Sequence, residues 1–248
     1  MSNPVKLKAQ VLSVKSFGPD TYSVKFKPEV APPRFKAGQF LHLTIDEYDP
    51  AGGFWPESRV FSIASAPGMS ELEIVYSVKG RYTRRMVEYL SPGREVWLKL
   101  PYGNFIIDAS ISPGQDAVII AGGTGISPFL PYFHGLAANN QKARTVRLYY
   151  GIRQNAMLLA GELIEACARA DLLEASLFVE NEKPDLCLPS CIRQESGRLD
   201  IRQIHTESKD LNNPAFFISG PPTMITTFKE ELAKSGVSSE NIIIDEWE

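Results

Sequence analysis

Residues 116–129 constrain the fold of this chain more than any other stretch. They read Asp-Ala-Val-Ile-Ile-Ala-Gly-Gly-Thr-Gly-Ile-Ser-Pro-Phe, in which an apolar run rich in β-branched residues predicts a buried parallel strand. The glycines that follow can bring main-chain N–H groups close to a ligand. Ser127 is a candidate N-cap and Pro128 a candidate first helical residue. A helix start behind a glycine turn favours a phosphate or pyrophosphate; the alternative is a tight turn without a ligand.

The spacing of these glycines does not by itself choose the ligand. Gly-Gly-x-Gly is neither the Gly-x-Gly-x-x-Gly dinucleotide fingerprint nor a P-loop, because no Gly-Lys-Ser/Thr follows. The rest of the chain has to supply the chemical identity of the site.

Composition excludes several classes of protein. The 248 residues suffice for two modest domains or one large one. The 26 Lys and Arg against 29 Asp and Glu leave a formal charge of −3, so no nucleic-acid partner is expected. Residues 117–141 carry no formal charge, but glycines and prolines divide them, so we do not expect a membrane span. The first residues lack an apolar core with a cleavage site, which predicts a cytoplasmic location.

The cysteines and histidines predict no metal site. Three cysteines are too few for a four-thiolate cluster, and no histidine pattern completes a zinc site. Any metal-cluster redox partner is therefore expected on another chain.

Residues 6–100 consist of short segments with alternating apolar residues, separated by turns rich in Pro, Gly and Asp. This pattern predicts a small antiparallel β-barrel. The positions expected on its inner face are Tyr22, Val24, Phe26, Leu41, Leu43, Ile45, Leu72, Ile74, Tyr76, Val78, Val96, Leu98 and Leu100. A short helix interrupts the strands, with Thr83 as its candidate cap and Ser91-Pro92-Gly93 at its end.

Two places in this half carry candidate chemistry. Arg59, Phe61 and Ser65 share one parity, with Ser62 at the strand edge, so they could address a planar aromatic ligand that has a phosphate tail. Residues 80–83, Gly-Arg-Tyr-Thr, put N–H groups and an arginine where an anion could bind. The alternative is an exposed strand and an ordinary turn.

The second half has a different pattern. After a Ser/Pro/Gly linker at 110–114, five strand candidates alternate with helical patterns, which predicts an open, largely parallel sheet with helices on both faces. The expected strands are 117–121, 146–150, 176–179, 215–218 and 242–244, and the expected helices are 128–138, 156–170, 199–205 and 223–234. Residues 181–198 show little periodicity and are expected to be an irregular connection. Ligands of such sheets bind at the carboxyl ends of the strands.

Five short motifs now make a family resemblance visible. They are Arg59-x-Phe-Ser-x-x-Ser65, Gly80-x-x-Thr83, Pro101-x-Gly-x-Phe105, Gly122-Gly-x-Gly-x-Ser-Pro128 and Ser219-Gly-Pro-Pro-x-Met224. In this order, and over nearly the whole chain, they resemble the ferredoxin–NADP reductase superfamily. The resemblance implies a flavin-binding β-barrel domain in residues 1–109 and a Rossmann-like, NAD(P)-binding α/β domain in residues 115–248.

The resemblance also implies which barrel residues hold FAD. Arg59 would bind the pyrophosphate, Phe61 would stack on the isoalloxazine in place of the usual tyrosine, and Ser62 would hydrogen-bond near the reactive N5. The remaining implied flavin contacts are Val75, Tyr76, Ser77, Gly80, Arg81, Tyr82 and Thr83. FMN is less expected than FAD because Arg59 and the 80–83 turn together suit a pyrophosphate.

A second implied set binds the nicotinamide nucleotide. Its members are Gly122, Gly123, Thr124, Gly125, Gly151, Arg153, Glu180, Gly220, Pro221, Met224 and Trp247. Ser62, Thr124 and Ser219 are the candidate catalytic residues, Ser219 standing where most relatives have cysteine. Trp247 could lie near the flavin or only cap the edge of the domain.

The preferred nucleotide follows from charge. NADP-using relatives place Ser-Arg after the third strand of this domain, where Glu180 and Asn181 stand here. A carboxylate accepts hydrogen bonds from ribose hydroxyls and repels a 2′-phosphate, so NADH is expected rather than NADPH. Arg153 is the opposing residue, because it could pair with a 2′-phosphate.

The function expected from the resemblance is an NAD(P)H-dependent flavin-containing reductase. It would transfer hydride from NADH to bound FAD and pass electrons to an acceptor on a separate chain or to a small molecule: a ferredoxin, a cytochrome, an oxygenase component or free flavin. One alternative is a non-catalytic flavin- or nucleotide-binding subunit that senses redox state in a larger complex. A second is a barrel that holds FMN or binds flavin only transiently.

Overall fold

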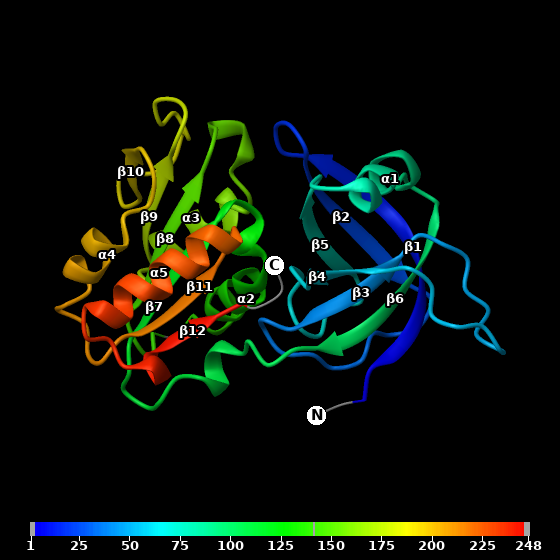
Figure 1. Cartoon of the computed structure of the whole chain (residues 1–248), viewed down its shortest axis with the longest axis horizontal. Coiled ribbons are helices and arrows are strands. Elements are labelled where there is room, and N and C mark those ends of the chain that lie inside the picture. The colour runs from blue at the N-terminus through cyan, green and yellow to red at the C-terminus, as the bar shows by residue number, and fades with distance from the viewer. Residues whose placement is uncertain (1–2, 141, 246–248) are drawn as a thin grey trace. The chain divides into compact units, whose positions relative to one another are not determined.

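The chain forms two compact units, drawn in Figure 1. The computed structural model describes residues 3–140 and 142–245. One unit contains Met1–Ile106 with Ser127–Pro131, and the other contains Ile107–Ile126 with Tyr132–Glu248.

The first unit is built on six antiparallel strands. They are β1 (Val5–Ser16), β2 (Thr21–Pro28), β3 (Phe40–Thr44), β4 (Arg59–Ser62), β5 (Leu72–Ser77) and β6 (Glu95–Tyr102), with helix α1 (Arg81–Tyr89) between the last two. The sheet order is β4-β3-β6-β1-β2-β5. A single bridge between Ile63 and Ile74 joins the two ends of this order, so the sheet nearly closes into the predicted barrel.

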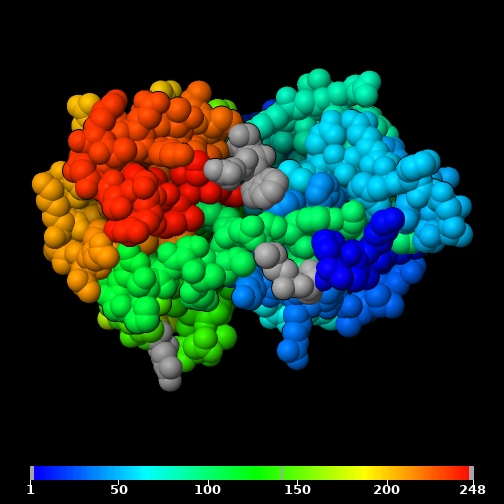
Figure 2. All heavy atoms as spheres, turned by 60° about the horizontal axis from the view of Figure 1, so that its bottom comes forward, coloured from blue at the N-terminus to red at the C-terminus, as the bar shows by residue number. Residues whose placement is uncertain are grey.

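The inner face of the barrel confirms the alternation in the sequence. Leu41 and Leu43 are fully buried, as are Leu72 and Leu98. Burial of such side chains is the main term that stabilises the unit, at about 25 cal/mol for each Å² of apolar surface removed from water. The loop between β3 and β4 lies outside this core; Figure 2 shows part of it in light blue at the surface, and its Phe54 is 97% exposed.

The second unit is built on a parallel sheet of six strands in the order β10-β9-β8-β7-β11-β12. The strands are β7 (Ala117–Gly122), β8 (Val146–Ile152), β9 (Glu174–Val179), β10 (Arg193–Ser196), β11 (Ala215–Ser219) and β12 (Ile242–Ile244). The helices are α2 (Leu130–Asn139), α3 (Gly161–Arg169), α4 (Ile201–Glu207) and α5 (Pro222–Lys234), with 3-10 turns η1 (Ile107–Ala109), η2 (Gly123–Phe129), η3 (Asn155–Met157) and η4 (Ser239–Asn241).

Helices cover both faces of this sheet, as predicted. Ile204 of α4 and Phe228 of α5 pack with Val118, Tyr149 and Phe216 on one face, and α5 runs across that face in Figure 1. On the other side, the buried Cys167 thiol of α3 donates to the carbonyl of Phe133 in α2 at 3.5 Å. The strand β7, buried from Ala117 to Ala121, is therefore in the middle layer of a three-layered α/β unit.

Three local expectations were wrong. Residues 193–196 form strand β10, parallel to β9, although their sequence Arg-Gln-Glu-Ser has no apolar pattern. Ser127 and Pro128 lie inside η2, and α2 begins only at Leu130. Gly80, not Thr83, is the N-cap of α1; the Thr83 hydroxyl folds back to accept from the Gly80 N–H at 3.1 Å.

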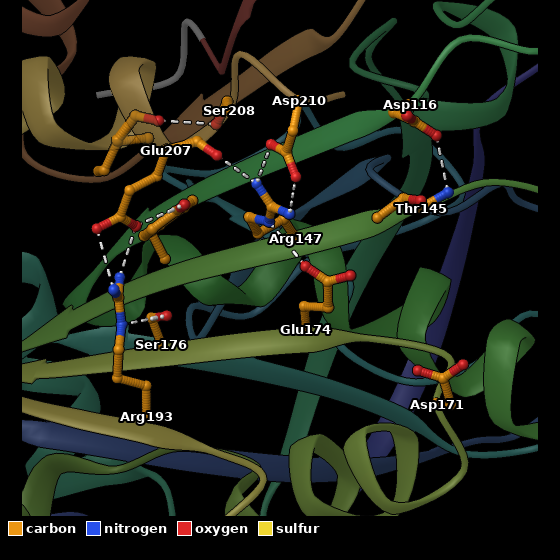
Figure 3. A network of polar contacts seen from close by, with 12 residues as sticks. Asp116, Thr145, Arg147, Asp171, Glu174, Ser176, Arg193, Glu207, Ser208 and Asp210 are labelled. Carbon is orange, nitrogen blue, oxygen red and sulfur yellow. Dashed lines mark hydrogen bonds and ion pairs between the residues drawn. The ribbon is translucent and has the colours of Figure 1, made fainter. Parts of the chain in front are cut away.

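A polar network explains how β10 and α4 are held (Figure 3). Glu207, the last residue of α4, accepts from both terminal nitrogens of Arg193 on β10 at 3.0 and 2.7 Å. It also accepts from the Tyr149 hydroxyl of β8 at 2.9 Å. Arg147 at the start of β8 bonds to Glu174 at 2.8 Å and to Asp210 at 3.0 Å. Hydrogen bonds between charged groups are stronger than those between neutral groups, and they reinforce one another when several of them meet at one carboxylate or guanidinium group.

The network shifts the titration of its members. Hydrogen bonds from Arg193 lower the pKa of Glu207 from 4.5 to about 2, and burial raises the pKa of Tyr149 to about 12. Because the pKa of Glu207 is depressed in the folded state, its contribution to stability is present above pH 4.5 and disappears as the pH falls toward 2.

We expect Glu207→Gln to lower the free energy of unfolding at neutral pH by about 1.5–3 kcal/mol, the range for hydrogen bonds to charged groups. The difference from wild type should narrow as the pH falls from about 4.5 to about 2. Urea unfolding followed by circular dichroism over this pH range measures it. Glu230→Gln, at an exposed position of α5, is the control for the lost charge; an equal loss in both variants would contradict the role of the network.

Candidate functional site

The carboxyl ends of the central strands form one edge of the parallel sheet. Register pairs Ala121 with Ser219 and Gly122 with Gly151, and it pairs Ile152 with Val179. The segments that follow β7, β8, β9 and β11 therefore lie along the same edge, where open parallel sheets bind their ligands.

Two loops at this edge approach each other so closely that only glycine fits. A Cβ atom on Gly125 would lie 2.3 Å from the carbonyl oxygen of Ser219, and one on Gly122 would lie 2.9 Å from Met224 Sδ and from Pro221 Cδ. A Cβ on Gly220 would lie 3.1 Å from the Gly122 Cα at the end of β7. The absence of side chains at these glycines is what lets the loop after β7 touch the loop after β11.

Gly123 has a different role from its neighbours. Its φ of +56° lies in the left-handed region, and a Cβ there would meet nothing within 4 Å. Gly123 thus turns the chain while leaving open space above its backbone, as a phosphate-binding turn requires. Thr124 follows it, half-buried, in the first turn of η2.

Ser219 is part of a buried polar pair that sequence reasoning missed. Its hydroxyl donates to Asp245 Oδ2 at 3.0 Å, and the two residues are only 4% and 7% exposed. The Asp245 N–H also donates to the Ile218 carbonyl at 2.9 Å, which continues the pairing of β12 with β11. Ser219 is the last residue of β11 and Asp245 directly follows β12, so the position of Asp245 at a strand end was the available signal.

Glu180 at the end of β9 is also paired. Arg198 donates from Nε to Glu180 Oε1 at 2.7 Å, while the Arg198 side chain is 82% exposed. Arg153 is exposed after β8, and its carbonyl accepts from the Asn181 N–H at 3.0 Å. The structure therefore brings Glu180 and Arg153 to one edge and adds Arg198, which lies in the segment whose fold the sequence did not reveal.

The other expected nucleotide contacts lie at this edge as well. Pro221 is exposed just before α5, and Met224 is half-buried in its first turn. Gly151 pairs with Gly122 across strands β7 and β8, and a Cβ on Gly151 would lie 3.0 Å from the Leu199 side chain. Trp247 lies outside the described residues.

In the barrel unit, Arg59 opens β4 and is fixed by three contacts. Its Nη1 donates to the Ser58 carbonyl at 2.8 Å, its Nη2 pairs with Glu57 at 2.8 Å, and its guanidinium lies 4.7 Å above the Tyr82 ring. Nearly half of the Arg59 side chain stays exposed, so its charge remains available to an anion.

The start of α1 lies beside this arginine. Arg81 is 84% exposed and reaches Glu57 at 4.0 Å, the carboxylate that Arg59 also contacts. Tyr82, which the resemblance implies as a flavin contact, is buried; its hydroxyl accepts from the Ile45 N–H and donates to the Glu57 carbonyl, both at 3.1 Å. Tyr82 is a structural anchor that supports Arg59 through its ring.

The remaining flavin candidates divide into buried and accessible groups. Val75 and Tyr76 are 6% and 2% exposed, and burial raises the Tyr76 pKa. The Tyr76 hydroxyl has no hydrogen-bond partner among the described residues. Phe61, with its ring 6.0 Å from that of Tyr76, is half-buried like Ser62 and Ser77.

The expectation that Ser65 shares a strand face with Arg59 and Phe61 was wrong. The strand β4 ends at Ser62, and Ser65 is buried with its hydroxyl accepting from the Glu73 N–H at 3.2 Å. It ties the chain after β4 to β5.

These geometries fit two anionic ligands. The barrel offers accessible guanidinium groups of Arg59 and Arg81 beside the N-terminus of a nine-residue helix, a donor set suited to a pyrophosphate. The parallel sheet offers a glycine turn with an accessible backbone at the carboxyl edge, which suits the pyrophosphate of a dinucleotide.

Other kinds of site find less support. Within the described part of the chain, no three His, Cys, Asp or Glu side chains gather to hold a metal ion. No helix in residues 3–140 or 142–245 is long and apolar enough to cross a bilayer.

Comparison with known proteins agrees with the fold and with the edge of the sheet. The model of the oxidoreductase NAD-binding domain family matches residues 119–230. The reductase component of propane 2-monooxygenase from Rhodococcus jostii (strain RHA1) is 27% identical over 97% of this chain. This chain spans 63% of the length of that protein. The human oxidoreductase NAD-binding domain-containing protein 1 is 25% identical, over 96% of this chain and 79% of its own.

Solved structures show the same two-domain fold. The cytochrome P450 reductase GcoB of Amycolatopsis superposes with a TM-score of 0.79 and 24% identity, over 98% of this chain and 70% of its own. A ferredoxin NADP+ reductase from Neisseria gonorrhoeae, solved with bound FAD and NADP, superposes with a TM-score of 0.71 and 20% identity, over 99% of this chain and 98% of its own.

Residues 119–230 match the oxidoreductase NAD-binding domain family, and the antiparallel barrel followed by a parallel sheet is the fold of these solved reductases. These structures confirm the two-domain fold that the motifs predicted by their resemblance to the ferredoxin–NADP reductase superfamily.

The close approach at Gly125 gives a direct test of the edge. Gly125→Ala places a methyl group against the Ser219 carbonyl, and we expect it to lower the free energy of unfolding by about 1–3 kcal/mol, as overpacking does. Gly135→Ala, inside α2 with nothing within 4 Å, is the control and should be neutral or stabilising by up to about 1 kcal/mol. Denaturant unfolding measures the stability of both variants. If Gly125→Ala has the same free energy of unfolding as wild type, the two loops separate freely and the close contact does not constrain them.

Proposed function

We propose that the protein is a reductase that takes hydride from NADH onto bound FAD and passes the electrons to a separate acceptor. The observation that carries this proposal is that one chain contains an accessible arginine cluster on a flavin-type barrel and an oxidoreductase NAD-binding domain. FAD would supply the change from two-electron to one-electron chemistry.

The barrel, which we assign as residues 1–109, would bind FAD through its charged rim. Arg59 and Arg81, beside the start of α1, would hold phosphate oxygens. The half-buried Phe61 offers a ring face for stacking, and its lack of a hydroxyl does not remove that face. Val75, Tyr76 and Ser77 would contribute through the backbone of β5, since two of these side chains are buried.

The α/β domain, which we assign as residues 115–248, would bind the nucleotide along the carboxyl edge. Gly122, Gly123 and Gly125 would let the backbone approach the pyrophosphate, and Thr124 and Gly220 would border the nicotinamide. Hydride transfer needs no side-chain acid or base, so the protein's part is to position the rings and exclude water. Ser219 would act in positioning, because Asp245 fixes the direction of its hydroxyl.

NADH remains the nucleotide we propose. Glu180 is placed at the end of β9, where a carboxylate accepts from ribose hydroxyls. Arg198 adds a competing feature, because a guanidinium already bonded to Glu180 could turn toward a 2′-phosphate.

The acceptor is proposed to be a protein on another chain, and an oxygenase component is the best candidate. The relatives include the reductase component of propane 2-monooxygenase and the electron transfer component of anthranilate 1,2-dioxygenase from Acinetobacter baylyi (strain ATCC 33305 / BD413 / ADP1). Both are named as components of oxygenases, which supports an oxygenase component as the acceptor here. The second candidate function, a redox-sensing subunit without turnover, is favoured only by Ser219 and Phe61 standing in place of the usual residues.

An anaerobic titration tests the proposal. We expect NADH to bleach the visible absorbance of the FAD-loaded protein quickly. NADPH should bleach it at least tenfold more slowly, because the Glu180 carboxylate repels the 2′-phosphate. Faster bleaching by NADPH would overturn the nucleotide assignment. Binding of both nucleotides without bleaching would replace the reductase by the sensing subunit.

The Glu180 pair can be tested separately. Glu180→Gln should lower the ratio of kcat/KM for NADH over NADPH by about tenfold, because it removes a charge that repels the 2′-phosphate. Adding Arg198→Ala should cancel the gain in NADPH use, whereas adding Arg153→Ala should leave it. The reverse pattern in steady-state kinetics would assign the phosphate to Arg153.

A further inference from the structure

A carboxylate lies among the arginines of the barrel rim. Glu57 is 2.8 Å from Arg59, 3.8 Å from Arg85 and 4.0 Å from Arg81. It is two residues before Arg59, and about 40% of its side chain is exposed. The cluster that suits a pyrophosphate thus already contains an anion.

Two of the three arginines, Arg59 and Arg85, have contacts besides Glu57 that hold their positions. Arg59 is also held by the Ser58 carbonyl and by the Tyr82 ring. Arg85 forms an ion pair with Asp46 and lies 5.6 Å above the same ring. The bond from Tyr82 to residue 57 goes to the backbone carbonyl, which any side chain at this position retains.

The net effect of Glu57 on a bound phosphate is therefore repulsive. An exposed ion pair contributes little to stability, because water screens it. A phosphate that binds Arg59 must share the guanidinium group with the Glu57 carboxylate or displace that carboxylate. Two negative charges a few ångströms apart repel each other, and the repulsion is stronger where water is partly excluded. Because other contacts orient the guanidinium groups of Arg59 and Arg85, removing the carboxylate costs little preorganisation at these two residues.

We infer that Glu57 weakens the binding of FAD and sets its exchange with free flavin, so that the protein holds FAD reversibly. This inference rests on the flavin site of the proposed function and concerns the phosphate end of that ligand. Glu57 is a residue that tunes affinity, separate from those that hold the flavin.

The test compares wild type with Glu57→Gln, which keeps the shape of the side chain and removes its charge. Dissociation constants and dissociation rates for FAD, FMN and riboflavin are measured by quenching of flavin fluorescence. We expect Glu57→Gln to bind FAD and FMN about threefold to tenfold more tightly, with correspondingly slower release. Riboflavin, which has no phosphate, should bind both proteins equally. The gain should shrink in 1 M salt, where the Debye length is about 3 Å.

Two controls keep the outcome interpretable. Glu47→Gln removes an exposed carboxylate from the same loop and should leave FAD affinity unchanged. Glu57→Ser provides a second neutral variant if the glutamine variant does not fold, judged by circular dichroism. Equal or weaker FAD binding by both folded variants would overturn the role of Glu57, as would an equal gain for riboflavin. If wild type binds none of the three flavins, the flavin part of the proposed function fails with it.

Discussion

The approach of the loop after β7 to the loop after β11 is the constraint on which the ligand edge depends. The Ser219 carbonyl occupies the space that a Cβ of residue 125 would need, and Met224 and Pro221 close on Gly122 in the same way. Because the two strands are neighbours in register, this contact fixes where the backbone of the glycine turn lies. Glycine at these positions does more than permit a turn, because it lets two segments of the main chain come into direct contact.

The parallel unit separates the contacts that stabilise it from the residues expected to bind its ligand. Arg147 and Glu174 stand at the amino ends of β8 and β9, where they and Glu207 clamp α4 onto the sheet (Figure 3). Ser219, Glu180 and the glycines stand at the carboxyl ends. In the barrel the two roles are closer together, since Tyr82 is both a buried anchor and the ring under Arg59.

Periodicity predicted the parts of the fold that apolar burial determines. Leu41 and Leu43 alternate with polar neighbours, and residues 117–121 form an unbroken apolar run, so their strands could be read directly. The glycine turn could be predicted because glycines clustered directly after a buried strand indicate a turn or a close approach of the backbone. Asp245, Arg198 and Glu57 were missed as functional residues because their meaning lies in contacts: Asp245 pairs with a residue 26 positions away, and Arg198 with one 18 positions away. Glu57 could have been noticed, since it shares the parity of Arg59, but only the structure shows several guanidinium groups around it.

The strand β10 shows why polarity can hide a strand and also protect it. It lies at one end of the sheet order, so one side of its backbone has no strand neighbour in the described sheet. An edge of this kind is a template on which another copy of the chain could add a strand and begin to aggregate. Arg193 and Glu195 place charges along it, and Arg193 is fastened to Glu207 by two hydrogen bonds. The sequence that carries no apolar pattern therefore discourages intermolecular pairing while the protein is at high concentration.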